Sequence, residues 1–215
     1  MSDAAESHAD LAYVKLESLI ITLKLKPSAM VTERQLIETC ALGRTPVREA
    51  IQRLNWQGLI SVRPRAGLQI APLRRENHKM ILEVRRQLEP LAARLVAGAV
   101  DDTARKALIA CAKAMTECSV TGDAEGFLAA DKEFDLILEA NCPNPFISQA
   151  LAPLQTHSRR FWFHSATAET LERSVNLHVS VIRAMLQENP VLAHDAMLKL
   201  LDGLTEMAAS NVTSR

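Results

Sequence analysis

The chain has 215 residues, of which 48% are hydrophobic and 4% aromatic, and its formal net charge is zero. This length allows one large domain or two small ones with a sizeable core. No apolar run approaches the roughly 18 residues of a membrane span, and the polar residues 1–10 contain no secretory signal, so we expect neither membrane insertion nor export. The four cysteines form no CxxC pair, which favours free thiols and a cytoplasmic location.

The charges are unevenly distributed along the chain. Residues 11–75 contain 11 Lys and Arg against four Glu, whereas residues 76–215 contain 14 basic and 18 acidic residues. The first part therefore has a net charge of +7 and the second a net charge of −4. A basic segment joined to an acidic one indicates that only the first part meets a polyanion.

Three helices are predicted in the first 60 residues. Apolar residues at helical spacing predict a helix over residues 9–25, which Pro27 ends. Thr32 is the predicted N-cap of a short second helix that ends near Cys40. Thr45 is the predicted N-cap of a third helix, with Pro46 at its first position and Gly58 as its left-handed terminator.

Two short β-like runs follow the third helix. Residues 59–62 and 68–70 have strand character, and residues 63–67, which include Pro64 and Gly67, form the predicted hairpin tip. Helix, helix, turn, helix and hairpin is the order of a winged helix-turn-helix. We therefore predict that residues 1–73 form a DNA-binding domain of three helices and a small β-hairpin.

The rest of the chain has a helical pattern throughout. The predicted helices span residues 76–99, 102–119, 123–140, 145–164, 168–188 and 190–210. Short breaks separate them, which is typical of an antiparallel bundle. The predicted fold is mainly α, with residues 74–215 forming an all-α six-helix bundle for effector binding and dimerisation.

The start of the third helix has the chemistry needed to read DNA. A recognition helix contacts base edges through its N-terminal turn, and the guanidinium group of arginine matches guanine O6 and N7. Arg44 and Arg48 lie four residues apart across this turn, and surface ion pairs with Glu33 or Glu49 are the alternative for them. The other candidate DNA contacts are Thr45, Arg34 on the preceding helix, and Arg63 and Arg65 at the hairpin tip.

The sequence resembles the DNA-binding domain of GntR-family bacterial regulators. The resemblance lies in residues 32–36, 43–54 and 58–60, and the run RTPVREA at residues 44–50 is its most specific part. It implies operator contacts by Arg34, Arg44, Thr45, Arg48 and the wing residues 65–67, which include Arg65 and Gly67. Gly43 replaces the usual Ser or Thr, and Ala66 interrupts the usual Arg-Gly pair of the wing.

The helical half resembles the ligand-sensing FCD domain of the FadR subfamily, in its VanR-like group. The resemblance is spread over residues 85–90, 131–135, 178–184 and 193–201. It implies a metal held by one Asp and three His. Asp131 and His178 keep two of these ligands, whereas Asp135 and Leu200 replace the other two.

Three uses of this group remain open from the sequence. Asp131, Asp135 and His178 are candidate ligands of a divalent metal ion, candidate contacts of an organic effector, or members of a buried hydrogen-bonded network. Arg85 is a candidate clamp for a carboxylate effector or a partner of Glu89 one turn along the helix. Two adjacent carboxylates repel an anion unless a cation or a proton lies between them.

These observations predict a ligand-responsive transcriptional regulator rather than an enzyme. A palindromic operator requires a two-fold dimer, because one recognition helix reads one half-site. The expected partners are double-stranded operator DNA, a small effector for which a carboxylate is the candidate class, and a second copy of the chain. The expected role is control of a catabolic operon. The alternatives are a metal-dependent hydrolase, which rests on the Asp/Asp/His group alone, and a non-specific architectural DNA-binding protein.

Overall fold

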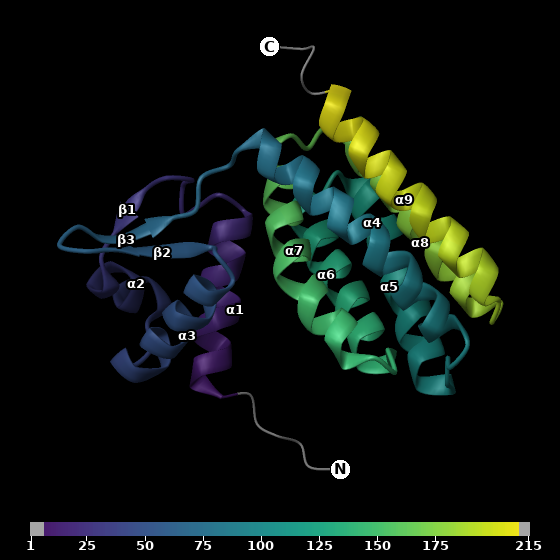
Figure 1. Ribbon diagram of the computed structural model, residues 1–215, viewed down its shortest axis with the longest axis horizontal. Helices are drawn as coiled ribbons and strands as arrows, with labels where there is room; N and C mark the ends of the chain where they lie inside the picture. Colours follow the sequence, from purple (N-terminus) through teal and green to yellow (C-terminus); the bar gives the residue numbers. More distant parts are fainter. Residues whose placement is uncertain (1–6, 211–215) are drawn as a thin grey trace. The chain divides into compact units, whose positions relative to one another are not determined.

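The computed structural model describes residues 7–210. The chain divides into two compact units, Met1–Arg74 and Arg75–Arg215. Figure 1 shows that the first unit combines helices with a small sheet and that the second is built from helices. The mainly α fold class predicted from the sequence is confirmed.

The first unit contains helices α1 (His8–Ile21), α2 (Glu33–Cys40) and α3 (Arg44–Trp56). Thr32 caps α2 as predicted, through a capping box in which its side chain and that of Gln35 satisfy each other's backbone amides. Helix α1 ends four residues before the predicted position, because Leu23 has a φ of 57° and so leaves the helical region. The α1 and α3 helices pack on each other over the apolar core of this unit.

The sheet has one more strand than the sequence predicted. Strands β2 (Ile60–Arg63) and β3 (Gly67–Ile70) form the expected hairpin, and β1 (Met30–Val31) pairs antiparallel with the other edge of β3. The strand order is therefore β1-β3-β2. A two-residue strand has too few side chains to show alternation, so its pairing is decided by the neighbouring hairpin.

The second unit contains six helices within the described residues: α4 (Arg75–Ala97), α5 (Asp102–Thr121), α6 (Ala124–Asn141), α7 (Pro145–His164), α8 (Ala168–Leu186) and α9 (Pro190–Ser210). Side-chain N-caps fix the starts of α5 to α8, and they are Asp101, Asp123, Asn144 and Thr167. These bounds agree with the predicted spans to within about two residues at most ends, as expected for helix termini.

The six helices surround one apolar core (Figure 1). Helix α4 packs along α9 and α7, α5 packs on α6 and α8, and α8 packs on α9. Leu200 of α9 is buried in this core. Among residues 7–210, no helix is both long and apolar enough to cross a membrane.

Candidate functional site

The N-terminus of α3 differs from the sequence prediction in its register. The helix begins at Arg44, with Gly43 as N-cap and no side-chain capping bond, so Thr45 is not the N-cap. Pro46 is consequently the third helical residue and not the first. The helix tolerates proline there because the amides of its first turn have no intrahelical partner, and the Val47 amide is the first to bond back, to the Gly43 carbonyl at 3.4 Å.

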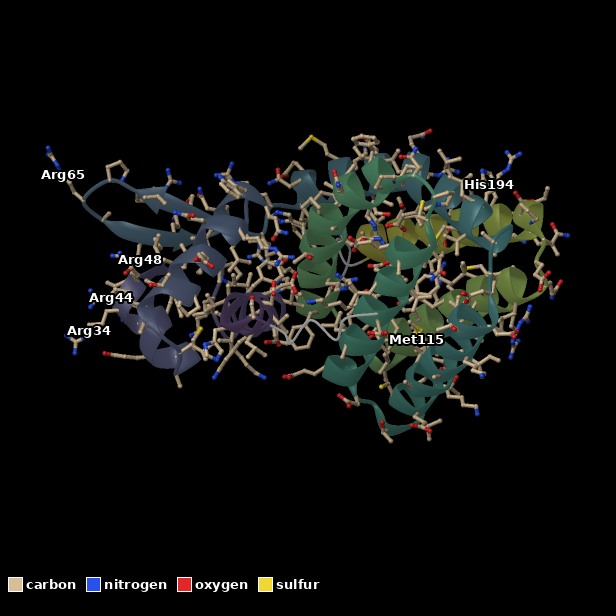
Figure 2. The ribbon with its side chains drawn as sticks, turned by 90° about the horizontal axis from the view of Figure 1, so that it is seen from below. Arg34, Arg44, Arg48, Arg65, Met115 and His194 are labelled. Carbon is tan, nitrogen blue, oxygen red and sulfur yellow. The ribbon has the colours of Figure 1, made fainter. Side chains whose placement is uncertain are left out.

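Three arginines project from this part of the first unit. Arg34, Arg44 and Arg48 are exposed, and Figure 2 shows them along one edge of that unit. The Arg34 Nε–H donates to Glu38 Oε1 at 2.8 Å, and the Arg48 Nε–H donates to Glu33 Oε1 at 2.7 Å. These pairs are solvent-exposed, so they contribute little to stability and cost little to break when a phosphate or a base competes.

The β2–β3 hairpin presents two further arginines. Arg65 lies at its tip in a left-handed conformation with a φ of 63°, and its side chain points away from the unit in Figure 2. Arg63 donates from Nε to Gln69 Oε1 at 2.8 Å across the hairpin. Gly67 has a φ of 105°, and a Cβ atom there would lie 2.9 Å from the Val31 carbonyl oxygen. Glycine is therefore needed at position 67 to seat β1 against the hairpin.

A second group of polar side chains is buried inside the helical unit. It comes from four helices, with Arg85 and Glu89 on α4, Asp131 and Asp135 on α6, Gln155, Ser158 and Arg159 on α7, and His178 on α8. The spacing of four residues places Asp131 and Asp135 on the same face of α6. The structure thus brings together all four residues that the sequence singled out in this half, namely Arg85, Asp131, Asp135 and His178.

Arg159 is the centre of this group. Its Nε–H donates to Asp131 Oδ2 at 2.6 Å, and its terminal nitrogen is ion-paired with Asp135 Oδ2. The other oxygen of Asp131 lies 2.8 Å from His178 Nε2, whose Nδ1 lies 2.7 Å from the Ser174 carbonyl oxygen. The cation that two adjacent carboxylates require is therefore a guanidinium group of the chain itself.

The neighbouring pair on α4 completes the network. Arg85 makes two hydrogen bonds to Glu89, at 2.6 and 3.1 Å, so the salt-bridge alternative for Arg85 describes this structure. The Gln155 amide nitrogen donates to Glu89 at 3.2 Å and to Asp135 at 2.8 Å, which links α4, α7 and α6. Sequence reasoning missed Gln155 and Arg159, although the demand of the two aspartates for a buried cation pointed to a basic residue.

The two aspartates have opposite pKa shifts. Burial opposes ionisation of Asp131, but the Arg159 charge and the His178 hydrogen bond outweigh it, so the pKa of Asp131 is lowered. Burial raises the pKa of Asp135 to about 7, and the charges of Asp131 and Glu89 add to this effect while Arg159 opposes it. The pKa of His178 is raised, because its contact with Asp131 outweighs burial.

These donors do not fit a metal ion. Among the described residues, no group of three or more His, Cys, Asp or Glu side chains is arranged to hold one. Both Asp131 oxygens are engaged, Arg159 adds a positive charge between the carboxylates, and Leu200 offers no ligand atom. The possible divalent metal considered from the sequence is therefore not supported by the residues present.

A small cavity borders the network. Its volume is about 20 Å³, and its lining includes Arg85, Asp131, Arg159, Trp162 and His178. This space is enough for about one water molecule. Of the aromatic run at residues 161–163, Trp162 lines the cavity and donates from Nε1 to Ser174 Oγ at 2.9 Å, so it serves both the core and the cavity.

His78, near the start of α4, is expected to make the stability of the folded protein sensitive to acid. Its ring stacks on Phe161 at 4.5 Å, and burial, with the Arg85 charge, lowers its pKa to about 4. Because the unfolded histidine takes up a proton at higher pH than the folded one, stability is lost as the pH falls from 6.5 to 4. From pH 7 to 4 we expect the unfolding free energy to fall on the order of 2 kcal/mol more in the wild type than in His78→Phe.

Urea denaturation at several pH values measures this difference, with replacement of the half-buried His194, labelled in Figure 2, by Phe (His194→Phe) as the matched control. Equal pH dependence in the wild type and in His78→Phe would contradict the assignment of the acid sensitivity to His78.

Two family models match the chain. The model of the bacterial regulatory proteins of the gntR family matches residues 9–70, and the FCD domain model matches residues 80–203, which is more than half of the chain. The first match contains α1 except for its first residue, α2, α3 and the wing. The second contains the whole buried network.

Curated relatives and solved structures agree with these matches. An uncharacterized HTH-type transcriptional regulator in the TAR-I ttuE-ttuC' intergenic region of Agrobacterium vitis is 29% identical over 143 residues, 65% of this chain and 83% of the relative. The probable D-xylose utilization operon transcriptional repressor of Paenarthrobacter nicotinovorans is 25% identical over 174 residues, 81% of this chain and 76% of the relative.

Among solved structures, E. coli McbR/YncC has a TM-score of 0.83 at 17% identity and covers 96% of this chain and 99% of its own. A putative GntR regulator from Rhodococcus sp. RHA1 has a TM-score of 0.74 at 18% identity, with the same coverage of both chains. The structural likeness shows the fold, and the family models show the class, which consists of transcription regulators and not of enzymes. The chain is thus a transcriptional regulator that belongs to the GntR family and carries an FCD domain.

Proposed function

We propose that this regulator binds a two-fold symmetric operator as a homodimer in the cytoplasm and that a small carboxylate effector in the helical unit changes its affinity for DNA. The observation that carries the proposal is the set of exposed arginines at the N-terminal turn of α3, within a winged helix-turn-helix. The name of the Paenarthrobacter relative, a repressor of a sugar utilization operon, supports control of a catabolic operon.

The roles of the arginines follow from their positions. Arg44 and Arg48 lie on the first turn and a half of α3 and are proposed to read guanine edges in the major groove. Arg34, from the preceding helix, and Thr45 are proposed to bind phosphates. Arg63 and Arg65, together with the Gly67 turn, place the wing against the flanking backbone or the minor groove.

The effector is proposed to bind at the buried network. Arg85 and Arg159 are buried guanidinium groups, and guanidinium groups pair with carboxylates through two hydrogen bonds. His178 and Asp131 line the same cavity. Asp135 is ion-paired with Arg159, which also lines it. Unchanged operator release by His178→Ala, with every acid that acts on the wild type, would remove His178 from the effector site.

An exposed apolar stripe on α4 is the proposed contact with the second copy. Met80, Val84 and Leu91 are 55%, 45% and 40% exposed, and their spacing places them on one face of the helix. A two-fold dimer brings the same patch of both copies together, so one apolar stripe serves both sides of the interface. The stripe belongs to the helix that follows the DNA-binding unit in the chain.

The double variant Val84→Glu/Leu91→Glu is expected to weaken dimerisation about 100-fold or more, because it places buried, unpaired charges in the contact. Sedimentation velocity over a concentration series measures this effect. Val120→Glu, at an 83% exposed site on α5, is the control and should leave the dimer intact. A monomeric wild type, or a dimer unaffected by the double variant, contradicts the proposed contact.

Footprinting of the region upstream of the gene itself tests the regulatory proposal. We expect protection of two half-sites whose centres are about one helical turn apart or a multiple of it, with affinity that falls steeply with salt. Equal affinity for random DNA of the same length would support the architectural alternative and overturn the proposal.

A further inference from the structure

The two guanidinium groups at the cavity are already bound to carboxylates of the chain. Arg85 is held by Glu89, and Arg159 is held by Asp131 and Asp135. All these side chains are largely buried, so the pairs are only weakly screened by solvent. An acid from outside that binds either arginine must therefore compete with an internal carboxylate.

The small volume of the cavity also requires that an incoming acid displace an internal side chain. The cavity of about 20 Å³ holds about one water molecule and leaves no room for an organic acid beside the existing side chains. A group that now occupies the site has to leave when an acid enters. If an internal carboxylate leaves, it frees a space of the size of a carboxylate group. It also frees a guanidinium group with which another carboxylate can pair.

Asp135 is the most weakly held of the three carboxylates. Asp131 is bound by both Arg159 and His178, and Glu89 is bound twice by Arg85 and once by Gln155. Asp135 has one terminal nitrogen of Arg159 and the Gln155 amide, and the charges of Asp131 and Glu89 both oppose its ionised form. It is therefore the side chain that a competing acid displaces first.

We propose that the Asp135 side chain occupies, in the absence of effector, the position on Arg159 that the carboxylate of the effector takes. A small carboxylate then binds without a metal by displacing Asp135 from Arg159. This inference rests on the proposed carboxylate-sensing function of the same site. The exchange keeps Arg159 paired with carboxylates but removes one of its two ion pairs with α6, so that Asp131 remains the α6 side chain paired with Arg159 of α7. It also frees the Gln155 amide, which bridges to Glu89 on α4, the helix that continues directly from the DNA-binding unit.

Chemical rescue of Asp135→Gly by sodium formate or sodium acetate tests the exchange. The variant lacks the internal carboxylate, so acetate should bind Arg159 and raise the melting temperature by several degrees above the value in sodium chloride of equal ionic strength. The wild type should show little of this rise, and the double variant Asp135→Gly/Arg159→Met should show none. The same rescue in the presence of EDTA is expected, because no metal takes part.

Glu133→Gly, an exposed position on α6 with the same backbone cost, is the matched control and should not respond to acetate. A second measurement uses Asp135→Asn, which keeps the size of the side chain. In a Trp56→Phe background, Trp162 fluorescence reports acetate binding at the cavity, and the affinity of Asp135→Asn should exceed that of the wild type by about 10-fold or more.

An acetate effect on Asp135→Gly no larger than that of chloride, or equal acetate affinities of Asp135→Asn and the wild type, would overturn the proposal. A gel shift on operator DNA separates the two claims. Rescue by acetate with no effect of any acid on operator binding keeps the exchange and rejects the sensing function. Operator release by an acid without rescue rejects the exchange alone.

Discussion

Replacement of Arg159 by Met is expected to lower the free energy of unfolding by about 3–5 kcal/mol, the range for breaking a buried ion pair from one side. The variant removes the guanidinium group that pairs with both Asp131 and Asp135, while Asp131 keeps its contact with His178 and Asp135 keeps its bond from Gln155. Methionine fills much of the volume of the arginine stem, so the loss reports on charge more than on packing. Urea denaturation at pH 7 measures the change.

Arg173→Met is the matched control for this prediction. Arg173 forms an ion pair with Glu206 at the surface of the same unit, where its removal should cost less than about 1 kcal/mol. Addition of Asp135→Asn to Arg159→Met should recover part of the lost stability, since it removes the negative charge of one of the two carboxylates that Arg159 neutralises. A loss for Arg159→Met as small as that for Arg173→Met would show that the network does not depend on its guanidinium group.

The second large effect is expected at the recognition helix. Arg44→Ala and Arg48→Ala should each weaken operator binding by about 1–3 kcal/mol and relax the base preference at one position of each half-site. The double variant should lose operator affinity about 100-fold or more, because the two arginines are proposed to contact different base pairs and their losses should then add. Fluorescence anisotropy with operator and random duplexes at two salt concentrations measures both the loss of affinity and the loss of base preference.

Two further variants make this prediction discriminating. Arg94→Ala removes one positive charge from an exposed site on α4 and should leave operator affinity unchanged within about twofold. Glu33→Gln removes the carboxylate that pairs with Arg48 and should strengthen binding slightly, since Arg48 is then free for DNA. Parallel losses on operator and random DNA in Arg44→Ala would make Arg44 a phosphate contact and would contradict its role in base reading.

Local signals predicted the helical elements well, and they failed where distant contacts decide the local structure. Pro145 and Pro190 are the first residues of α7 and α9, and Asp101 and Asp123 cap α5 and α6, so these starts are encoded within a few residues. By contrast, β1 exists only because β3 pairs with it. The start of α3 at Arg44 was missed because Gly43 caps without a side chain and leaves no sequence signal.

The sequence also predicted which residues of the buried network lie together better than it predicted how they are paired. Helical spacing alone places Asp131 and Asp135 on one face, and the family resemblance adds His178 and Arg85. The charge that holds them together comes from α7, 24 residues after Asp135, and no spacing rule connects the two positions. Gln155 was missed for the same reason, since an amide has no periodic signature.

The sequence by itself determined that the protein is a DNA-binding regulator, because its most specific family motif, which carries the arginines proposed to read DNA, lies within one short segment, residues 44–50. Only the tertiary structure decided what lies at the centre of the helical unit. There Arg159 neutralises Asp131 and Asp135, and that pairing depends on the approach of α6 and α7 in three dimensions. The physical reason is that a helix terminus is specified by neighbours in the sequence, whereas a buried ion pair is specified by packing.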